Sequence, residues 1–145
     1  MRAVAGVIVA FVVMSVLVLA LSLAPWYLLG VDSVLEPGRF DGTPAFDAYA
    51  VFVGVAGAVL AGWICWKIGR LQLAVSILAV ICFAGGLLNH FGQHHKPEPG
   101  VRAAGLSVMD AVNQRKEADW FTLLMPCLGA AGVLFGSGLA AARRP

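Results

Sequence analysis

The sequence predicts an all-α integral membrane protein, a bundle of four transmembrane helices in a single domain over residues 1–145. Of its residues 60% are apolar, where an ordinary soluble domain has roughly 45–50%. Only 12% are charged, about half of the usual share. Four apolar runs match the length of about 20 residues that a helix needs to cross the hydrocarbon core. This composition excludes a soluble globule, a disordered chain and a nucleic-acid-binding protein.

The first apolar run covers residues 3–30 and is predicted to be an uncleaved membrane anchor. It is longer than the 7–15 apolar residues, approximately, of a secretory signal peptide. Pro25 is expected to kink or end this helix near the membrane interface. Trp26 and Tyr27, which follow it, are expected to act as aromatic anchors in the headgroup region.

The later apolar runs predict three further helices, and the polar segments between them predict the loops. No alternation of period two, which would indicate a membrane β-barrel, is visible in the sequence. The predicted helices cover residues 48–66, 71–90 and 120–142, and the two outer loops cover residues 31–47 and 91–119.

The charge pattern predicts the orientation. Basic residues are dense in the short segments 1–2, 67–70 and 143–145, whereas all eight acidic residues fall in the two longer loops. Because cytoplasmic segments carry an excess of Lys and Arg, both termini are expected in the cytoplasm. The expected location is the cell inner membrane, with the lipid bilayer as the first partner.

The second outer loop predicts a short amphipathic surface helix within residues 101–117. This helix would either rest on the membrane surface or cap the bundle. Its apolar face would comprise Val101, Gly105, Val108, Met109 and Val112, and its polar face Ser107, Asp110, Asn113 and Gln114.

Small residues recur at helical spacing in two of the predicted spans. They are Gly54, Ala58 and Gly62 in one, and Gly132 and Gly136 in the other. Because lipid supplies no hydrophobic drive between helices, small residues that allow close backbone approach are typical helix-packing positions. The pattern fits packing within the bundle, and it equally fits a homo-oligomer or docking on another membrane protein.

The three histidines form the one cluster with ligand chemistry. His90 and His94 are four residues apart and share a helical face, so with His95 they are candidate metal ligands. A role in pH sensing, or in binding a quinone or haem at the interface, is a further alternative. The interpretation without a binding role is that these side chains simply end the helix in the hydrated headgroup region. The sequence itself requires no cofactor.

Other catalytic signals are missing from the sequence. It contains no HExxH motif and no phosphate-binding loop. No ionisable residue lies deep in a predicted span, which disfavours an ion-coupled transporter. The three cysteines lie within predicted spans, so they do not indicate a disulfide framework. An enzymatic activity is left open only through the histidine cluster.

Two segments carry a resemblance. The stretch GWICWKIGR at residues 62–70 closes the second predicted helix, and WF at 120–121 followed by MPCLGA at 125–130 opens the last. Together they resemble small bacterial four-helix integral membrane proteins of unassigned function. The resemblance implies that architecture and a bacterial inner membrane, and it implies no functional residues.

The function expected from these features is that of a non-catalytic accessory or interaction subunit of a membrane protein complex. Its expected partners are other membrane proteins or a second copy of the chain. One alternative is a metal- or cofactor-binding redox component that uses His90, His94 and His95. Another alternative is a component of a small-solute transporter or channel.

Overall fold

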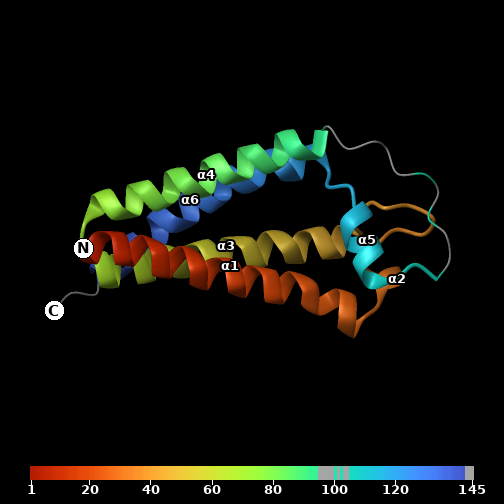
Figure 1. Ribbon diagram of the computed structural model, residues 1–145, viewed down its shortest axis with the longest axis horizontal. Coiled ribbons are helices and arrows are strands. Elements are labelled where there is room, and N and C mark those ends of the chain that lie inside the picture. The colour runs from red at the N-terminus through yellow and green to blue at the C-terminus, as the bar shows by residue number, and fades with distance from the viewer. Residues whose placement is uncertain (95–99, 101, 103–104, 143–145) are drawn as a thin grey trace.

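A computed structural model describes residues 1–94, 100, 102 and 105–142, and within them it shows six helices and no extended strand. Four of these helices are long and apolar enough to cross a membrane, which confirms the predicted all-α four-helix class (Figure 1). The long helices are α1 (Arg2–Leu28), α3 (Pro44–Gly69), α4 (Gln72–His94) and α6 (Asp119–Ala142), and the short ones are α2 (Val31–Val34) and α5 (Val108–Gln114).

The long helices are arranged as two pairs, α1 with α3 and α4 with α6. Helices α3 and α6 are central, because α6 packs along both α3 and α4 while α1 packs mainly along α3. The pairs lie close together near Met1 and separate towards the opposite end, where α2 and α5 lie (Figure 1). We call these the terminal end and the loop end.

Glycines bring the two pairs into backbone contact in the terminal half. A methyl group on Gly62 of α3 would collide with the Val133 carbonyl oxygen of α6. In the same way, a methyl group on Gly136 of α6 would collide with the Val59 carbonyl oxygen of α3. Only glycine allows this approach, and close approach strengthens the dispersion contacts that hold membrane helices together.

The other predicted packing residues follow the same contact towards the loop end. A Cβ on Gly132 would lie 3.0 Å from the Cβ of Ala58, and a Cβ on Gly54 would meet the flexible end of Met125. The contact between α3 and α6 therefore changes along its length. It is backbone against backbone at one end and backbone against a side chain at the other.

Local signals set the ends of α3. Thr43 begins the helix, because its side chain accepts a hydrogen bond from the Phe46 N–H and Pro44 occupies the first helical position. Arg70 ends it in the left-handed conformation, with φ 50° and its N–H bonded to the Trp66 carbonyl. Helix α4 starts two residues later, so a tight turn joins α3 to α4.

Pro25 lies inside α1, which continues to Leu28, so the proline does not end the helix. A proline has no N–H to donate to the carbonyl four residues earlier, here that of Leu21. The Tyr49 hydroxyl of α3 donates to this carbonyl at 2.9 Å. The backbone group freed by Pro25 is thereby satisfied by the neighbouring helix.

The expectation for the aromatic residues after Pro25 is wrong for Trp26. Its side chain is buried and packs edge to face on Phe46, with ring centroids 5.6 Å apart. Tyr27, the next residue, is exposed. Trp26 therefore belongs to a small core at the loop end, in which its ring gains more burial than the headgroup region offers.

A cap of short elements covers the loop end of α1 and α3. Between α2 and α3 the chain turns back on itself, with a bridge between Leu35 and Gly42, and a second bridge joins Asp41 to Lys116 after α5. The buried side chains of this cap core are Trp26, Val34, Leu35, Phe40, Phe46 and Ala111.

Helix α5 belongs to this cap, and the predicted apolar face is partly wrong. Ala111 is fully buried, with Val108 and Val112 packed beside it, whereas Met109 is 60% exposed. The buried positions follow the spacing i, i+3, i+4 of one helical face. Val101 lies outside the described residues.

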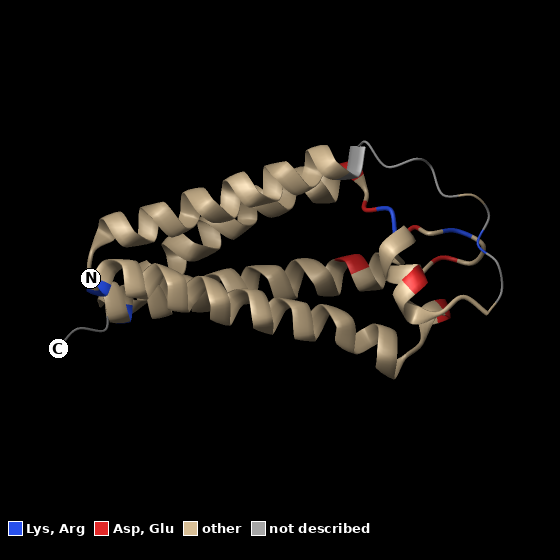
Figure 2. Ribbon diagram, in the orientation of Figure 1, with Lys and Arg blue, Asp and Glu red and all other residues tan. Residues whose placement is uncertain are grey.

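Charges separate along the bundle (Figure 2). In the described part of the chain the terminal end carries Arg2, Lys67 and Arg70 and no acidic residue. The acidic side chains that the structure describes are all at the loop end, together with further basic residues. The acidic set is Asp32, Glu36, Asp41, Asp47, Asp110, Glu117 and Asp119.

Candidate binding cavity

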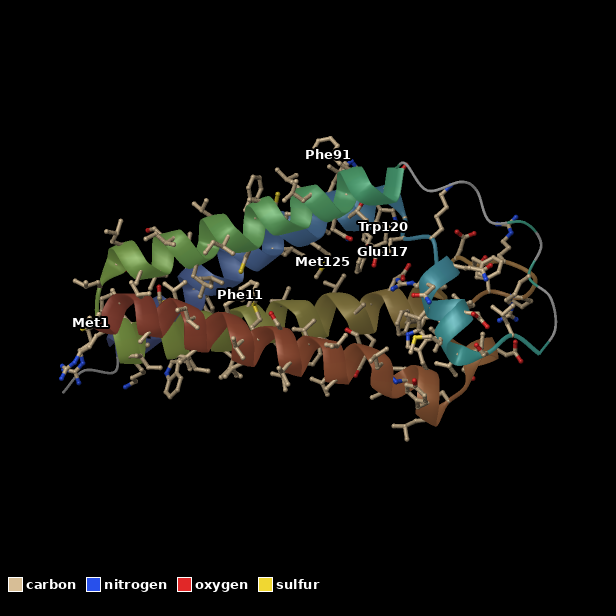
Figure 3. The ribbon with its side chains drawn as sticks, viewed as in Figure 1. Met1, Phe11, Phe91, Glu117, Trp120 and Met125 are labelled. Carbon is tan, nitrogen blue, oxygen red and sulfur yellow. The ribbon has the colours of Figure 1, made fainter. Side chains whose placement is uncertain are left out.

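A partly open cavity of about 330 Å³ lies between the two helix pairs in the loop half of the bundle. All four long helices line it, and Arg115 and Glu117 border it from the segment between α5 and α6. Figure 3 shows Met125 of α6 in the space between the pairs, with Glu117 nearer the loop end. We call Arg115 and Glu117, together with Asp47, the rim of the cavity. Apart from this rim, the cavity walls are mostly apolar.

The cavity exists because α6 leaves α3 and follows α4. A Cβ on Gly86 of α4 would overlap the ring of Pro126, so this glycine lets the proline of α6 pack directly on α4. At this level α3 presents Ala50 and Gly54, two small residues that do not fill the space. The tight α3–α6 contact at Gly62 and Gly136 therefore opens into a cavity within a few turns.

Arg115 closes the cavity at the loop end. Its guanidinium lies between the rings of Phe46 and Phe121, with its Cζ 4.7 Å and 5.9 Å from the two ring centroids. Its Nη2 donates to the Asp47 carboxylate at 2.8 Å. Because Phe46 and Asp47 belong to α3 and Phe121 to α6, one side chain joins the two helix pairs through cation–π and ionic contacts.

Gly42 allows the ion pair to form against the cap. A Cβ at this position would lie 2.6 Å from Asp47 Oδ1 and 3.3 Å from Arg115 Nη2. The backbone of the hairpin therefore covers the pair closely. Both side chains are mostly buried, at 13% exposed for Arg115 and 15% for Asp47. Such a pair is screened much less by salt than a surface pair is.

Glu117 extends the link to the α4 side. Its Oε1 lies 3.7 Å from Arg115 Nη1, and its Oε2 accepts a hydrogen bond of 3.3 Å from the Asn89 side chain. We call residues 115–118, between α5 and α6, the strap. The strap crosses the loop end of the cavity and contacts α3 through Arg115 and α4 through Glu117.

One buried hydrogen-bond donor at the rim has no partner among the described residues. The Arg115 Nε is buried and has no hydrogen-bond partner in the described part of the chain. Both oxygens of Glu117, in contrast, face a donor or a cation. The charges of Arg115, Asp47 and Glu117 are one positive and two negative. The rim therefore has a slightly negative net charge. Its unused hydrogen-bonding group is nevertheless a donor, the Nε–H of Arg115.

His90 packs between helices. It is buried on α4, and its Nδ1 lies 2.7 Å from the Thr122 hydroxyl oxygen of α6. The same hydroxyl lies 3.0 Å from the Asp119 carbonyl oxygen. Because a hydroxyl has one hydrogen, a Thr122 that donates to Asp119 accepts from the Nδ1–H tautomer of His90. His90 thereby joins α4 to α6 next to the cavity.

The histidine cluster is described only in part. The side chain of His94 and the whole of His95 lie outside the described residues. Among the residues that the structure describes, no group of three His, Cys, Asp or Glu side chains is placed to bind a metal ion. The structure places the His90 side chain in an interhelical contact with Thr122.

The rim residues were not singled out in the sequence. Arg115 and Asp47 are 68 positions apart, and each is an ordinary polar residue at the end of a predicted helix or loop. The available signal is the presence of Phe46 and Phe121 beside acidic residues at two helix starts. That signal indicates that the two helix starts lie at an interface, but it does not indicate that Arg115 and Asp47 form an ion pair.

Comparisons with protein-family models, with curated proteins and with solved structures find no match for this chain. The functional argument therefore rests on the cavity and its rim.

Proposed function

We propose that the protein is a non-catalytic accessory subunit of a membrane protein complex, which holds a small apolar molecule between its helix pairs. The cavity of about 330 Å³ carries this proposal. It falls within the roughly 300–1,000 Å³ of typical small-molecule sites, and it combines apolar walls with a few polar groups at one end. The ionisable groups at its rim are bound to one another, which suits binding better than proton transfer.

We further propose a multi-pass location in the bacterial inner membrane, with both termini in the cytoplasm. The four helices long enough to span a membrane support the multi-pass arrangement. The basic terminal end, which holds Arg2, Lys67 and Arg70 without a described acid, supports the orientation through the positive-inside rule.

The outer face of α1 supports an interaction role. Helix α1 is the least buried of the four candidate spans. One of its faces exposes large apolar side chains over more than three turns, among them Val4, Ile8, Val12 and Val16. Since the bundle leaves this face uncovered, it offers lipid or a partner helix a continuous surface.

Purification in a mild detergent with cross-linking tests the accessory role. We expect the chain in a larger assembly, with a cross-linked neighbour whose mass separates a second copy from a different protein. Val16→Trp on α1 should reduce recovery of the neighbour. Val80→Trp on α4, a valine of similar exposure, should not. Recovery of the chain only as a monomer, with no cross-linked neighbour, would contradict the role.

A further inference from the structure

We propose that the cavity takes a neutral amphiphile whose polar end carries carbonyl oxygens. Such oxygens occur on a quinone ring and at the ester linkages of a lipid. The inference rests on the proposed function, because it names the chemical class of the molecule held there. The route into the cavity, its walls and its rim each contribute an argument.

The route into the cavity is from the bilayer. Helices α1 and α4 are the outer members of the row α1–α3–α6–α4. They meet near the terminal end, where Ala3 and Ala74 line one shared groove. Nearer the loop end both helices line the cavity, which is partly open, α1 through Val18 and α4 through Gly86. An amphiphile dissolved in lipid therefore reaches the cavity between these two helices.

The walls favour an apolar tail and a flat or compact head. Deep in the cavity the lining includes Val18, Gly54 and Met125, which offer no hydrogen-bond donor and only the weak thioether acceptor of Met125. Nearer the rim it includes the rings of Trp26, Phe46 and Phe121. Aromatic rings present flat faces and edges to a bound group. The polarity thus rises from the membrane interior towards the strap, as it does along an amphiphile.

The rim favours a bound amphiphile whose head group is neutral. An anion would meet the carboxylates of Asp47 and Glu117, and an ammonium group would have to displace Asn89 or Arg115 from Glu117. A neutral carbonyl oxygen requires neither, since it accepts from guanidinium hydrogens of Arg115 that Asp47 leaves unused. The buried Nε of Arg115 gains a partner in this way if the side chain turns slightly.

Probes with neutral, anionic and cationic head groups test which head group the cavity binds. The full chain in detergent is titrated calorimetrically with four probes that carry ten-carbon chains: decylbenzoquinone, didecanoylglycerol, decanoate and decylamine. We expect at least one neutral probe to bind at least tenfold more tightly than both charged probes. The separate responses of the two neutral probes distinguish a quinone from an ester lipid.

Matched variants distinguish binding of a probe in the cavity from its uptake by the detergent micelle. Ala50 lines the cavity and Ala56, on the same helix, is exposed, so Ala50→Leu should weaken the neutral probe at least tenfold and Ala56→Leu should not. Arg115→Lys keeps the charge and removes the Nε donor, and it should also weaken the neutral probe. If Arg115→Lys does not fold, the probe series and the alanine pair decide the question.

Two results would overturn the inference in different ways. If decanoate or decylamine binds as tightly as the neutral probes, and Ala50→Leu weakens it, the head class is wrong while the binding function stands. If no probe binds in a manner that depends on Ala50, both the inference and the proposed binding function fail.

Discussion

At the scale of single residues, Pro25 and Pro126, which lie inside described helices, each involve a contact with a neighbouring helix. Pro25 leaves the Leu21 carbonyl without its helical donor, and Tyr49 of the neighbouring helix supplies one. Pro126 has its ring seated on Gly86, so the proline of α6 becomes a packing group for α4. The hydrogen bond from Tyr49 is the kind of compensation by which a membrane helix tolerates a proline.

Replacing Tyr49 should weaken the contact between α1 and α3. Tyr49→Phe removes the donor to Leu21, and we expect a loss of about 1 kcal/mol in the free energy of unfolding, the usual size for an interhelical hydrogen bond in a membrane. Thermal unfolding in detergent measures it. Tyr27→Phe, at an exposed tyrosine of α1, is the control and should have no effect.

A double-mutant cycle identifies the cause of that loss. Pro25→Ala restores a backbone N–H that can reach the Leu21 carbonyl. In the Pro25→Ala background, Tyr49→Phe should therefore cost clearly less than it does alone. Equal costs in both backgrounds would show that the tyrosine acts through packing and not through the freed carbonyl.

The glycines of the α3–α6 contact should differ sharply from those on the outside. Gly136→Ala would force its new methyl group against the Val59 carbonyl oxygen, and we expect it to destabilise the bundle by about 1–3 kcal/mol. Gly138→Ala, two residues on, meets open space and should be neutral or slightly stabilising. Melting temperatures in the same detergent compare them. Similar losses for both variants would contradict the backbone contact.

At the scale of elements, α5 packs as part of the cap core. The fully buried Ala111 sets its orientation, and the larger Met109 faces outward. This arrangement lets a seven-residue helix pack closely on the hairpin between α2 and α3. A helix that short has little stability by itself, so its contacts hold it in place.

Enlarging the buried side of α5 should therefore loosen the cap. Ala111→Leu should overpack the cap core and increase hydrogen exchange in α5 and in the strap, without changing exchange in the terminal half. Met109→Ala, on the exposed side, should leave exchange unchanged. If Met109→Ala were the disruptive variant, α5 would be packed through the face that the sequence pattern predicts.

The long elements were predictable from sequence and the cap was not, for a physical reason. A membrane span is defined by length and composition, which are local, so the apolar runs indicate all four long helices. The face that α5 buries depends on residues more than 60 positions away, such as Leu35 and Phe40. A pattern of apolar residues favours the larger Met109 for the buried face, while close packing selects the smaller Ala111.

In the candidate site, too, some features could be predicted from the sequence and others could not. Gly62 and Gly136 are recognisable as packing positions because small residues repeat at helical spacing in each span. The rim depends on Arg115 meeting Asp47 of α3 and Glu117 meeting Asn89 of α4. Which helices diverge, and hence where a cavity forms, depends on pairwise packing that no single helix encodes.

At the scale of the whole molecule, the charge separation predicts an orientation that labelling can test. Single cysteines are placed at Arg39 in the loop-end hairpin and at Gln72, the start of α4, both exposed. The native cysteines Cys65, Cys82 and Cys127 are first replaced by alanine. A membrane-impermeant maleimide should label Arg39→Cys in intact cells and Gln72→Cys only after permeabilisation. The reverse pattern would invert the proposed topology.

The central position of α6 has a consequence for the order in which the chain is made. Helices α3 and α4 follow each other through a tight turn, yet each packs more extensively on α6 than on the other. During synthesis α1, α3 and α4 leave the ribosome first, so α1 can pack on α3, but α3 and α4 lack their contacts with α6 until α6 follows. Until then the bare glycine face around Gly62 and the unmatched Gly86 lie open to lipid. Membrane quality-control proteases therefore have a defined interval in which to meet an unfinished bundle, and α6 ends that interval.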